Sequence, residues 1–128
     1  MALRDQIRIM VVDDMSTSRG LITQALDGFG VRQIESAADG PSALQLLARW
    51  PAHLIISDMN MPGMNGLQLL QALRSTAKTR NVGFLLITGK ADRQIIESGK
   101  QLGMNNFLPK PFQPADLRKA IEAVVGRL

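Results

Sequence analysis

The stretch Ile9-Met10-Val11-Val12-Asp13-Asp14 decides how this chain is interpreted, because an apolar run ends abruptly in two adjacent carboxylates. The run Leu54-Ile55-Ile56-Ser57-Asp58 repeats the pattern. Continuous apolar runs of this length are typical of buried parallel strands. Ligands of an open parallel sheet bind beyond the carboxyl ends of its strands. The two runs therefore predict that Asp13, Asp14 and Asp58 meet at one edge of a sheet. Carboxylates there repel one another unless a hard divalent cation lies among them.

Apolar runs alternate with helical patterns along the chain, which indicates an α/β fold with a parallel sheet. The predicted strands cover residues 7–12, 33–36, 54–57, 83–88 and 106–108. The predicted helices follow them over about residues 16–30, 41–49, 67–73, 95–103 and 114–128. Ser16 or Thr17 is the expected N-cap of the first helix, and Gly30 suits its C-terminal end. The result is five β-α units without an internal repeat or an interdomain linker.

The composition is that of an ordinary globular domain, with 128 residues, 45% of them hydrophobic and 20% charged. No apolar run approaches the roughly 20 residues of a membrane span, and the N-terminus carries no signal-peptide pattern. Cysteine is absent, which excludes a disulfide framework and a thiolate metal site. We therefore expect one cytoplasmic domain over residues 1–128, without a membrane partner. The net charge of +4 is scattered from Arg4 to Arg127 with no nucleic-acid-binding motif, so no nucleic-acid partner is expected.

The predicted strands end in polar groups of the kind that phosphoryl chemistry requires. Asp13 and Asp14 end the first strand, Asp58 the third and Thr88 the fourth, and Lys110 follows the fifth. Oxygen ligands suit Mg²⁺, and a carboxylate beside a bound metal can attack a phosphoryl group. The metal and a lysine then offset charge on the transferring oxygens, while a threonine hydroxyl can bond one of them. Taken singly, the carboxylates could merely cap helices and Lys110 could be a solvated charge. Their joint positions favour a phosphoryl site.

Four groups resemble, in order and spacing, the site of the receiver domains of two-component response regulators: Asp13-Asp14, Asp58, Thr88 and Lys110-Pro111-Phe112. The segment after Asp58, DMNMPGMNGL, is similar to the D-x-x-M-P-x-M-[DN]-G-L loop of that family. The resemblance covers almost the whole chain. It implies a flavodoxin-like, doubly wound (βα)5 sheet with strand order 2-1-3-4-5.

The resemblance also implies a role for each carboxylate. Asp58 would accept a phosphoryl group from the phosphohistidine of a histidine kinase. Asp14, Asp58 and the backbone carbonyl of Asn60 would bind Mg²⁺ directly. Asp13 would act mainly through metal-bound water.

The remaining implied roles concern the groups around Asp58. Lys110 would contact the Asp58 carboxylate and then the phosphoryl group, and the Lys110–Pro111 bond would be cis. Thr88 would turn inward to bond a phosphoryl oxygen, and Gly89 would leave room for it. Phe107 would change rotamer with activation.

Two positions depart from the pattern of single-domain chemotaxis regulators. Phe107 stands where they usually carry tyrosine, so the aromatic ring is kept and the hydroxyl is lost. Lys90 stands where they often carry an acid. With Asn60, Lys90 would flank the path of the hydrolytic water and so influence phosphoryl lifetime. An electrostatic contact to the phosphoryl group and a solvated surface lysine remain equal alternatives for Lys90.

The chain ends just after the last predicted helix, so we expect a monomeric receiver without an output domain that signals by binding another protein. The expected partners are a chemotaxis-type histidine kinase, the flagellar motor switch and a phosphatase. A phosphate sink or relay receiver of another two-component pathway is the alternative. We expect slow self-dephosphorylation rather than enzymatic turnover. A metal-dependent aspartyl phosphatase is less favoured, because Asn60 stands where that chemistry wants a second acid. A constitutive scaffold would not need the acidic set.

Overall fold

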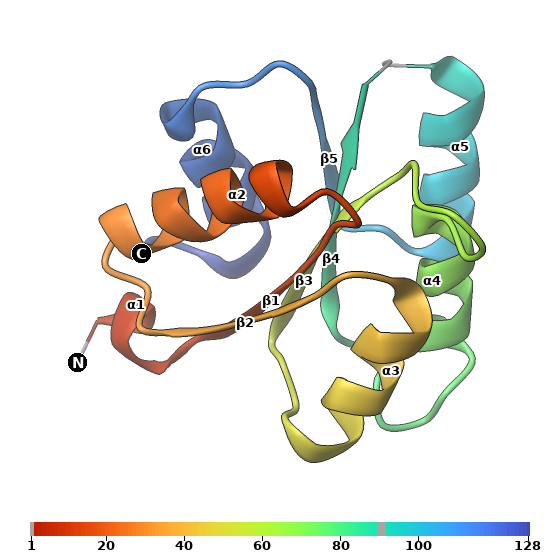
Figure 1. The fold of residues 1–128 in the computed structure, drawn as a ribbon, viewed down its shortest axis with the longest axis horizontal. Helices are drawn as coiled ribbons and strands as arrows, with labels where there is room; N and C mark the ends of the chain where they lie inside the picture. The colour runs from red at the N-terminus through yellow and green to blue at the C-terminus, as the bar shows by residue number, and fades with distance from the viewer. Residues whose placement is uncertain (1, 90–91) are drawn as a thin grey trace.

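The computed structural model describes residues 2–89 and 92–128, and within them five parallel strands form one sheet in the order β2-β1-β3-β4-β5 (Figure 1). The strands are β1 (Arg8–Val12), β2 (Gln33–Ala37), β3 (Leu54–Asp58), β4 (Gly83–Thr88) and β5 (Asn106–Pro109). The helices are α1 (Leu3–Gln6), α2 (Ser16–Gly28), α3 (Gly40–Arg49), α4 (Gly66–Arg74), α5 (Arg93–Leu102) and α6 (Pro114–Val125). The predicted parallel sheet and its strand order are confirmed.

Helices cover both faces of the sheet, as a doubly wound fold requires (Figure 1). On one face, Leu26 of α2 and Leu117 of α6 pack against strand residues such as Ile56. On the other, α3, α4 and α5 pack over residues such as Met10 and Phe84. All five residues of β3 are buried, because this central strand is covered on both faces. None of the helices in the described ranges combines the length and apolarity needed to cross a membrane.

The start of α2 differs from the prediction. Its N-cap is Met15, which makes no side-chain cap, so the assignment of the cap to Ser16 or Thr17 was wrong. The Met15 backbone N–H donates to Asp13 Oδ1 at 3.0 Å, so the Asp13 side chain holds the chain just before α2. The helix then begins at Ser16 itself, which places Met15 at the cap position. The short helix α1 was not predicted either.

The loop after β3 folds back tightly onto the end of that strand. A Cβ built on Gly66 would lie 2.7 Å from the backbone oxygen of Asp58 and 2.7 Å from Leu86 Cδ1, so only glycine fits. Asn65 and Gln68 then start α4 with a capping box, in which each side chain accepts a hydrogen bond of 2.9 Å from the other's backbone N–H. The residues after Asp58 are therefore anchored to both β3 and α4.

The two edges of the sheet are short. β5 has four residues, and its last residue, Pro109, has no backbone N–H to donate. β2 has five residues, and Glu35 and Ser36 within it are exposed. Phe107 lies on β5, partly buried against the core that α3, α4 and α5 cover.

Candidate functional site

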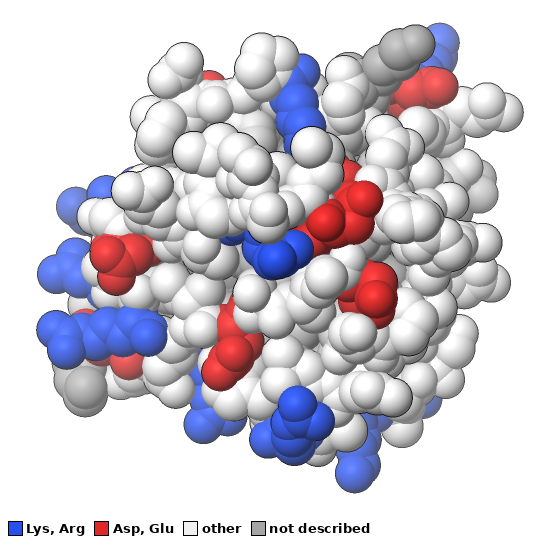
Figure 2. Space-filling view, in the orientation of Figure 1, with Lys and Arg blue, Asp and Glu red and all other residues white. Residues whose placement is uncertain are grey.

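Three carboxylates converge at the carboxyl edge of the sheet, as predicted. One oxygen from each of Asp13, Asp14 and Asp58 lies within 4.8 Å of the others. Asp13 and Asp58 are buried, whereas Asp14 is exposed. In Figure 2, acidic side chains gather near the centre of the view, and Lys and Arg lie mostly around the periphery. The arrangement concentrates negative charge at the strand ends of a chain whose net charge is positive.

Asp13 is held on nearly every side. Its backbone N–H donates to Ala37 O at 3.1 Å, and its Oδ1 accepts from the Met15 N–H. Its carbonyl oxygen accepts from Arg19 Nη1 at 2.7 Å. Among the described residues, Asp13 Oδ2 is the one buried side-chain polar atom without a hydrogen-bond partner.

An orphaned, buried carboxylate oxygen costs roughly 1–3 kcal/mol, so its presence calls for a ligand. The Asp13 carboxylate lies beside two other carboxylates, and the cluster contains no thiolate or imidazole donor. This donor set consists of oxygen alone, which fits a hard divalent cation, bound directly or through its water. The residues present therefore suit a magnesium-type ion.

Asp58 forms an ion pair with Lys110, whose Nζ lies 2.6 Å from Asp58 Oδ1. The Asp58 side chain is only 7% exposed and the Lys110 side chain 33%. Burial raises the pKa of Asp58 above its usual value, and the hydrogen bond and charge of Lys110 oppose that rise. The negative charges of Asp13 and Asp14 add to it. The pKa of Asp58 is raised overall, so one lysine does not fully compensate this carboxylate.

Thr88, Gly89 and Asn60 were also predicted to belong to the site. Thr88 is the buried last residue of β4, and its carbonyl accepts from the Lys110 backbone N–H at 2.7 Å. A Cβ on Gly89 would meet no atom within 4 Å, so the space beside Thr88 is open. Asn60 is exposed, two residues after Asp58.

Three further predictions concern positions around Lys110. The Lys110–Pro111 bond is cis, as the resemblance implies. Phe107 pairs in register with Leu86, two residues before the strand end, so it stands back from the carboxylates. Lys90 lies outside the described residues.

Sequence reasoning missed two groups that hold the site. Arg19 bonds the Asp13 carbonyl, and the Ser57 hydroxyl donates to the Asp58 carbonyl at 3.0 Å. Both contacts are made to backbone oxygen. Such contacts depend on local chain geometry and leave no pattern of residue types to find.

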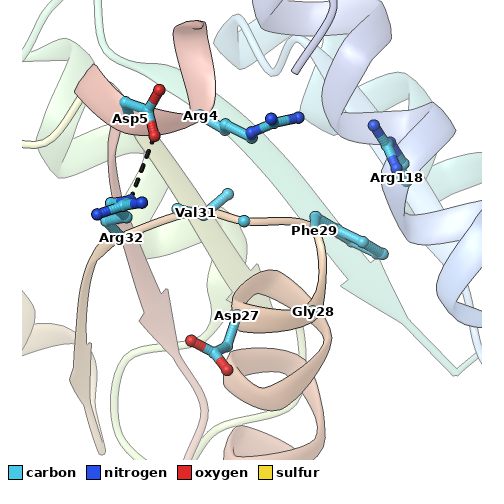
Figure 3. A pocket seen from close by; sticks show the side chains of 9 residues that line it. Arg4, Asp5, Asp27, Gly28, Phe29, Val31, Arg32 and Arg118 are labelled. Carbon is cyan, nitrogen blue, oxygen red and sulfur yellow. Dashed lines mark ion pairs between the residues drawn. The ribbon is translucent and has the colours of Figure 1, made fainter.

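A hollow of about 730 Å³ lies near the amino end of β2 and is lined by three arginines, Arg4, Arg32 and Arg118 (Figure 3). Arg32 pairs with Asp5 at 3.2 Å. Arg118 stacks 5.6 Å from the Phe29 ring centroid and also pairs with Glu122 at 3.5 Å. These two cations already have carboxylate partners, and Asp27 lines the hollow together with the third arginine, Arg4, so its lining charges are mixed in sign and do not favour an anionic ligand.

Comparison with known proteins agrees with this geometry. The family model of the response regulator receiver domain matches residues 9–122. A probable chemotaxis protein CheY from Rhizobium etli is 42% identical over 128 residues, which cover 100% of this chain and 99% of that protein.

Two solved structures share the fold. The chemotaxis protein CheY4 of Vibrio cholerae superposes with a TM-score of 0.88 at 31% identity, over 94% of this chain and 99% of that one. The receiver domain of a sensor histidine kinase from Pseudomonas aeruginosa, solved with magnesium in its active-site cleft, gives 0.84 at 27% identity, over 95% and 99%. The chain belongs to the family of response regulator receiver domains. Within that family, the two chemotaxis proteins named above are single-domain proteins. The flavodoxin-like fold predicted for the chain is confirmed.

Proposed function

We propose that this protein is a phosphorylation-switched response regulator of a cytoplasmic two-component system, in which Asp58 accepts a phosphoryl group from a histidine kinase. The observation that carries the proposal is the buried Asp58 carboxylate, 2.6 Å from Lys110 Nζ and within 4.8 Å of two further carboxylates. A carboxylate of raised pKa that is held by a lysine at a strand end is placed for chemistry rather than for stability.

Each site residue has a separate role in phosphoryl transfer. The Asp58 carboxylate attacks phosphorus, the phosphorus–nitrogen bond of the phosphohistidine breaks, and the donor imidazole leaves with the bonding electrons. Lys110 stabilises the transferring oxygens, and Thr88 donates its hydroxyl to one of them. Asp14, Asp58 and the backbone carbonyl of Asn60 would hold Mg²⁺, with Asp13 acting through water. Bound Mg²⁺ would supply further neutralisation of negative charge.

The open space at Gly89 admits the phosphoryl group, and the resulting state is read out by a binding partner. A change of Thr88 and Phe107 toward the site would shift the population of a second conformation. Lys90 and Asn60 would set how long the phosphoryl group survives. Asn60 lacks the acid or base that a true aspartyl phosphatase needs at this position, which favours slow self-hydrolysis over turnover.

An apolar groove of about 430 Å³ beside the site suits a docking phosphodonor. It runs from Met15 and Leu21 to Lys110 and Pro111, so it is continuous with the lysine that holds Asp58. Met15 and Leu21 are 61% and 64% exposed and are the exposed large hydrophobic side chains of the described chain. Two such side chains in one groove indicate a surface that a partner covers.

The groove can be tested separately from the chemistry. Leu21→Ser should slow phosphorylation by a histidine kinase phosphotransfer domain that labels the wild type, and leave labelling by acetyl phosphate unchanged. Equal rates from the kinase domain would remove the groove from the proposal.

We further propose output in chemotaxis, through binding of the phosphorylated form to the flagellar motor switch. The support is the 42% identity over the full chain to a protein named as a chemotaxis regulator. A phosphate sink or relay is the second candidate, favoured by the loss of the usual tyrosine hydroxyl at Phe107. Affinity for a purified motor-switch protein with and without acetyl phosphate separates the two.

The decisive experiment is phosphorylation with acetyl phosphate in the presence and absence of Mg²⁺, followed by intact-protein mass spectrometry. The wild type should gain one phosphoryl group only with Mg²⁺, and Asp58→Asn should gain none. Asp27→Asn, which removes an exposed carboxylate remote from the site, is the matched control and should be labelled normally. Labelling of Asp58→Asn at the wild-type level would refute the assignment.

A further inference from the structure

Arg19 makes an unusual contact for a helix-surface arginine. It lies in the first turn of α2, partly buried, and its Nη1 donates to the backbone carbonyl of Asp13 at 2.7 Å. The ion pairs of the described residues do not include Arg19. Its guanidinium is therefore used to hold backbone oxygen rather than to neutralise a carboxylate. A charged donor at this distance makes one of the stronger types of hydrogen bond.

The carbonyl that Arg19 holds belongs to the peptide joining Asp13 to Asp14. Because a peptide unit is planar, holding its oxygen fixes the direction in which the chain leaves Asp13 and enters Asp14. The Asp13 backbone N–H is tied to Ala37 of β2, and its Oδ1 to the Met15 N–H. Arg19 holds the carbonyl oxygen of Asp13, at the peptide that leads into Asp14. The Asp14 residue itself is exposed to solvent.

We propose that Arg19 is a positioning residue for divalent-cation binding, which holds the Asp13–Asp14 peptide so that both carboxylates face Asp58. This inference rests on the cation site of the proposed function. Residues that orient metal ligands typically change metal affinity by about 10- to 100-fold when they are removed.

Because Arg19 is positively charged, the direction in which its removal changes Mg²⁺ affinity tests the inference. A cation near a metal site repels the metal, so removing the charge alone should strengthen Mg²⁺ binding. Removing the hydrogen bond should weaken it, because Asp14 is then free to turn into solvent. Weaker binding after loss of a positive charge can therefore come only from lost positioning.

The experiment is a calorimetric titration of the metal-free protein with MgCl₂, with the melting temperature of each metal-free variant measured in parallel. Arg19→Gln should raise the Mg²⁺ Kd about tenfold. Arg19→Lys, which keeps the charge and can still donate to the carbonyl, should fall between Arg19→Gln and the wild type. Arg49→Gln makes the same change of charge at the exposed C-terminal end of α3 and should bind like the wild type.

An unchanged or lower Kd in Arg19→Gln would overturn the inference. This holds also where the metal-free melting temperature falls, since Arg19 would then have only a structural role. If Arg19→Gln does not fold, a raised Kd in Arg19→Met together with a lower Kd in Arg19→Lys than in Arg19→Met gives the supporting result, and equal Kd values in these two variants overturn it. Failure of the wild type to bind Mg²⁺ would refute both proposals. Normal Mg²⁺ binding without labelling of Asp58 would count against the proposed function alone.

Discussion

Replacing Gly66 with alanine tests how tightly the loop after β3 is held against the strand that carries Asp58. The added Cβ would lie 2.7 Å from Asp58 O, 2.7 Å from Leu86 Cδ1 and 3.0 Å from Met59 Cα. Two of these three atoms belong to the backbone, which cannot move aside as a flexible side chain can. The loop must therefore shift away from β3, and the hydrogen bond of 2.9 Å from the Gly66 N–H to Met59 O must lengthen.

The expected cost follows from these contacts. Overpacking a close-packed site costs about 1–3 kcal/mol. Alanine regains part of that through its better helix propensity, by at most about 1 kcal/mol in a helix interior and less at a first helical position. The net loss should be about 1–2 kcal/mol, which corresponds to a fall in melting temperature of roughly 4–8 °C for a chain of this size.

Gly20→Ala is the matched control, because a Cβ on Gly20 would meet no atom within 4 Å. In the interior of α2 it should stabilise the protein by about 1 kcal/mol. Urea unfolding of both variants and the wild type, followed by circular dichroism, gives the two differences. If Gly66→Ala were as stable as the wild type, the close approach of the loop to Asp58 would be refuted. A gain of stability in both variants would show that helix propensity, not contact, decides the outcome.

Two further substitutions test the charge and the cap at the site. Since burial raises the pKa of Asp58 above 3.8, the stability that this carboxyl contributes is fully present below pH 3.8 and is lost as pH rises through the folded-state pKa. Asp58→Asn should therefore be more stable than the metal-free wild type at pH 7, by about 1 kcal/mol. That gain should shrink as pH falls toward 3.8, and urea unfolding at several pH values that found it constant or growing would contradict the argument. Asn65→Ala removes the capping side chain of α4 and should lower the free energy of unfolding by about 1 kcal/mol, whereas Asn65→Asp should keep most of the stability that the cap contributes. Equal urea midpoints for the wild type and both variants would show that the cap contributes nothing.

The strand-end groups were predictable because strand burial and strand polarity leave a pattern in the sequence. An apolar run such as Leu54–Ile56, followed after one residue by Asp58, reveals both the strand and the edge at which its carboxylate lies. The strand bounds predicted in this way differ from the structure by at most one residue at an end: β1 begins at Arg8 instead of residue 7, whereas β4 has the predicted bounds. The cluster of three carboxylates followed from the parallel topology alone.

The contacts that hold those groups were not predictable. Arg19 and Ser57 both donate to backbone carbonyls, and any residue can supply a carbonyl, so the partner cannot be recognised from residue type. The N-cap of α2 was also mispredicted, because Ser16 is a good capping residue in isolation, whereas in the structure it is the first residue of the helix and Met15 is at the cap position. The helix α1 spans only four residues, which is too short for a 3.6-residue periodicity to be detected.

The short edges of the sheet bear on how the protein behaves when crowded. A long, flat edge strand exposes unpaired backbone N–H and C=O groups that can pair with a strand of another molecule. Here β5 offers four residues that end in a proline, and β2 exposes a glutamate. Neither edge can extend a ladder far into a neighbouring copy. The protein can therefore be present at high concentration in solution without its backbone joining one copy to the next.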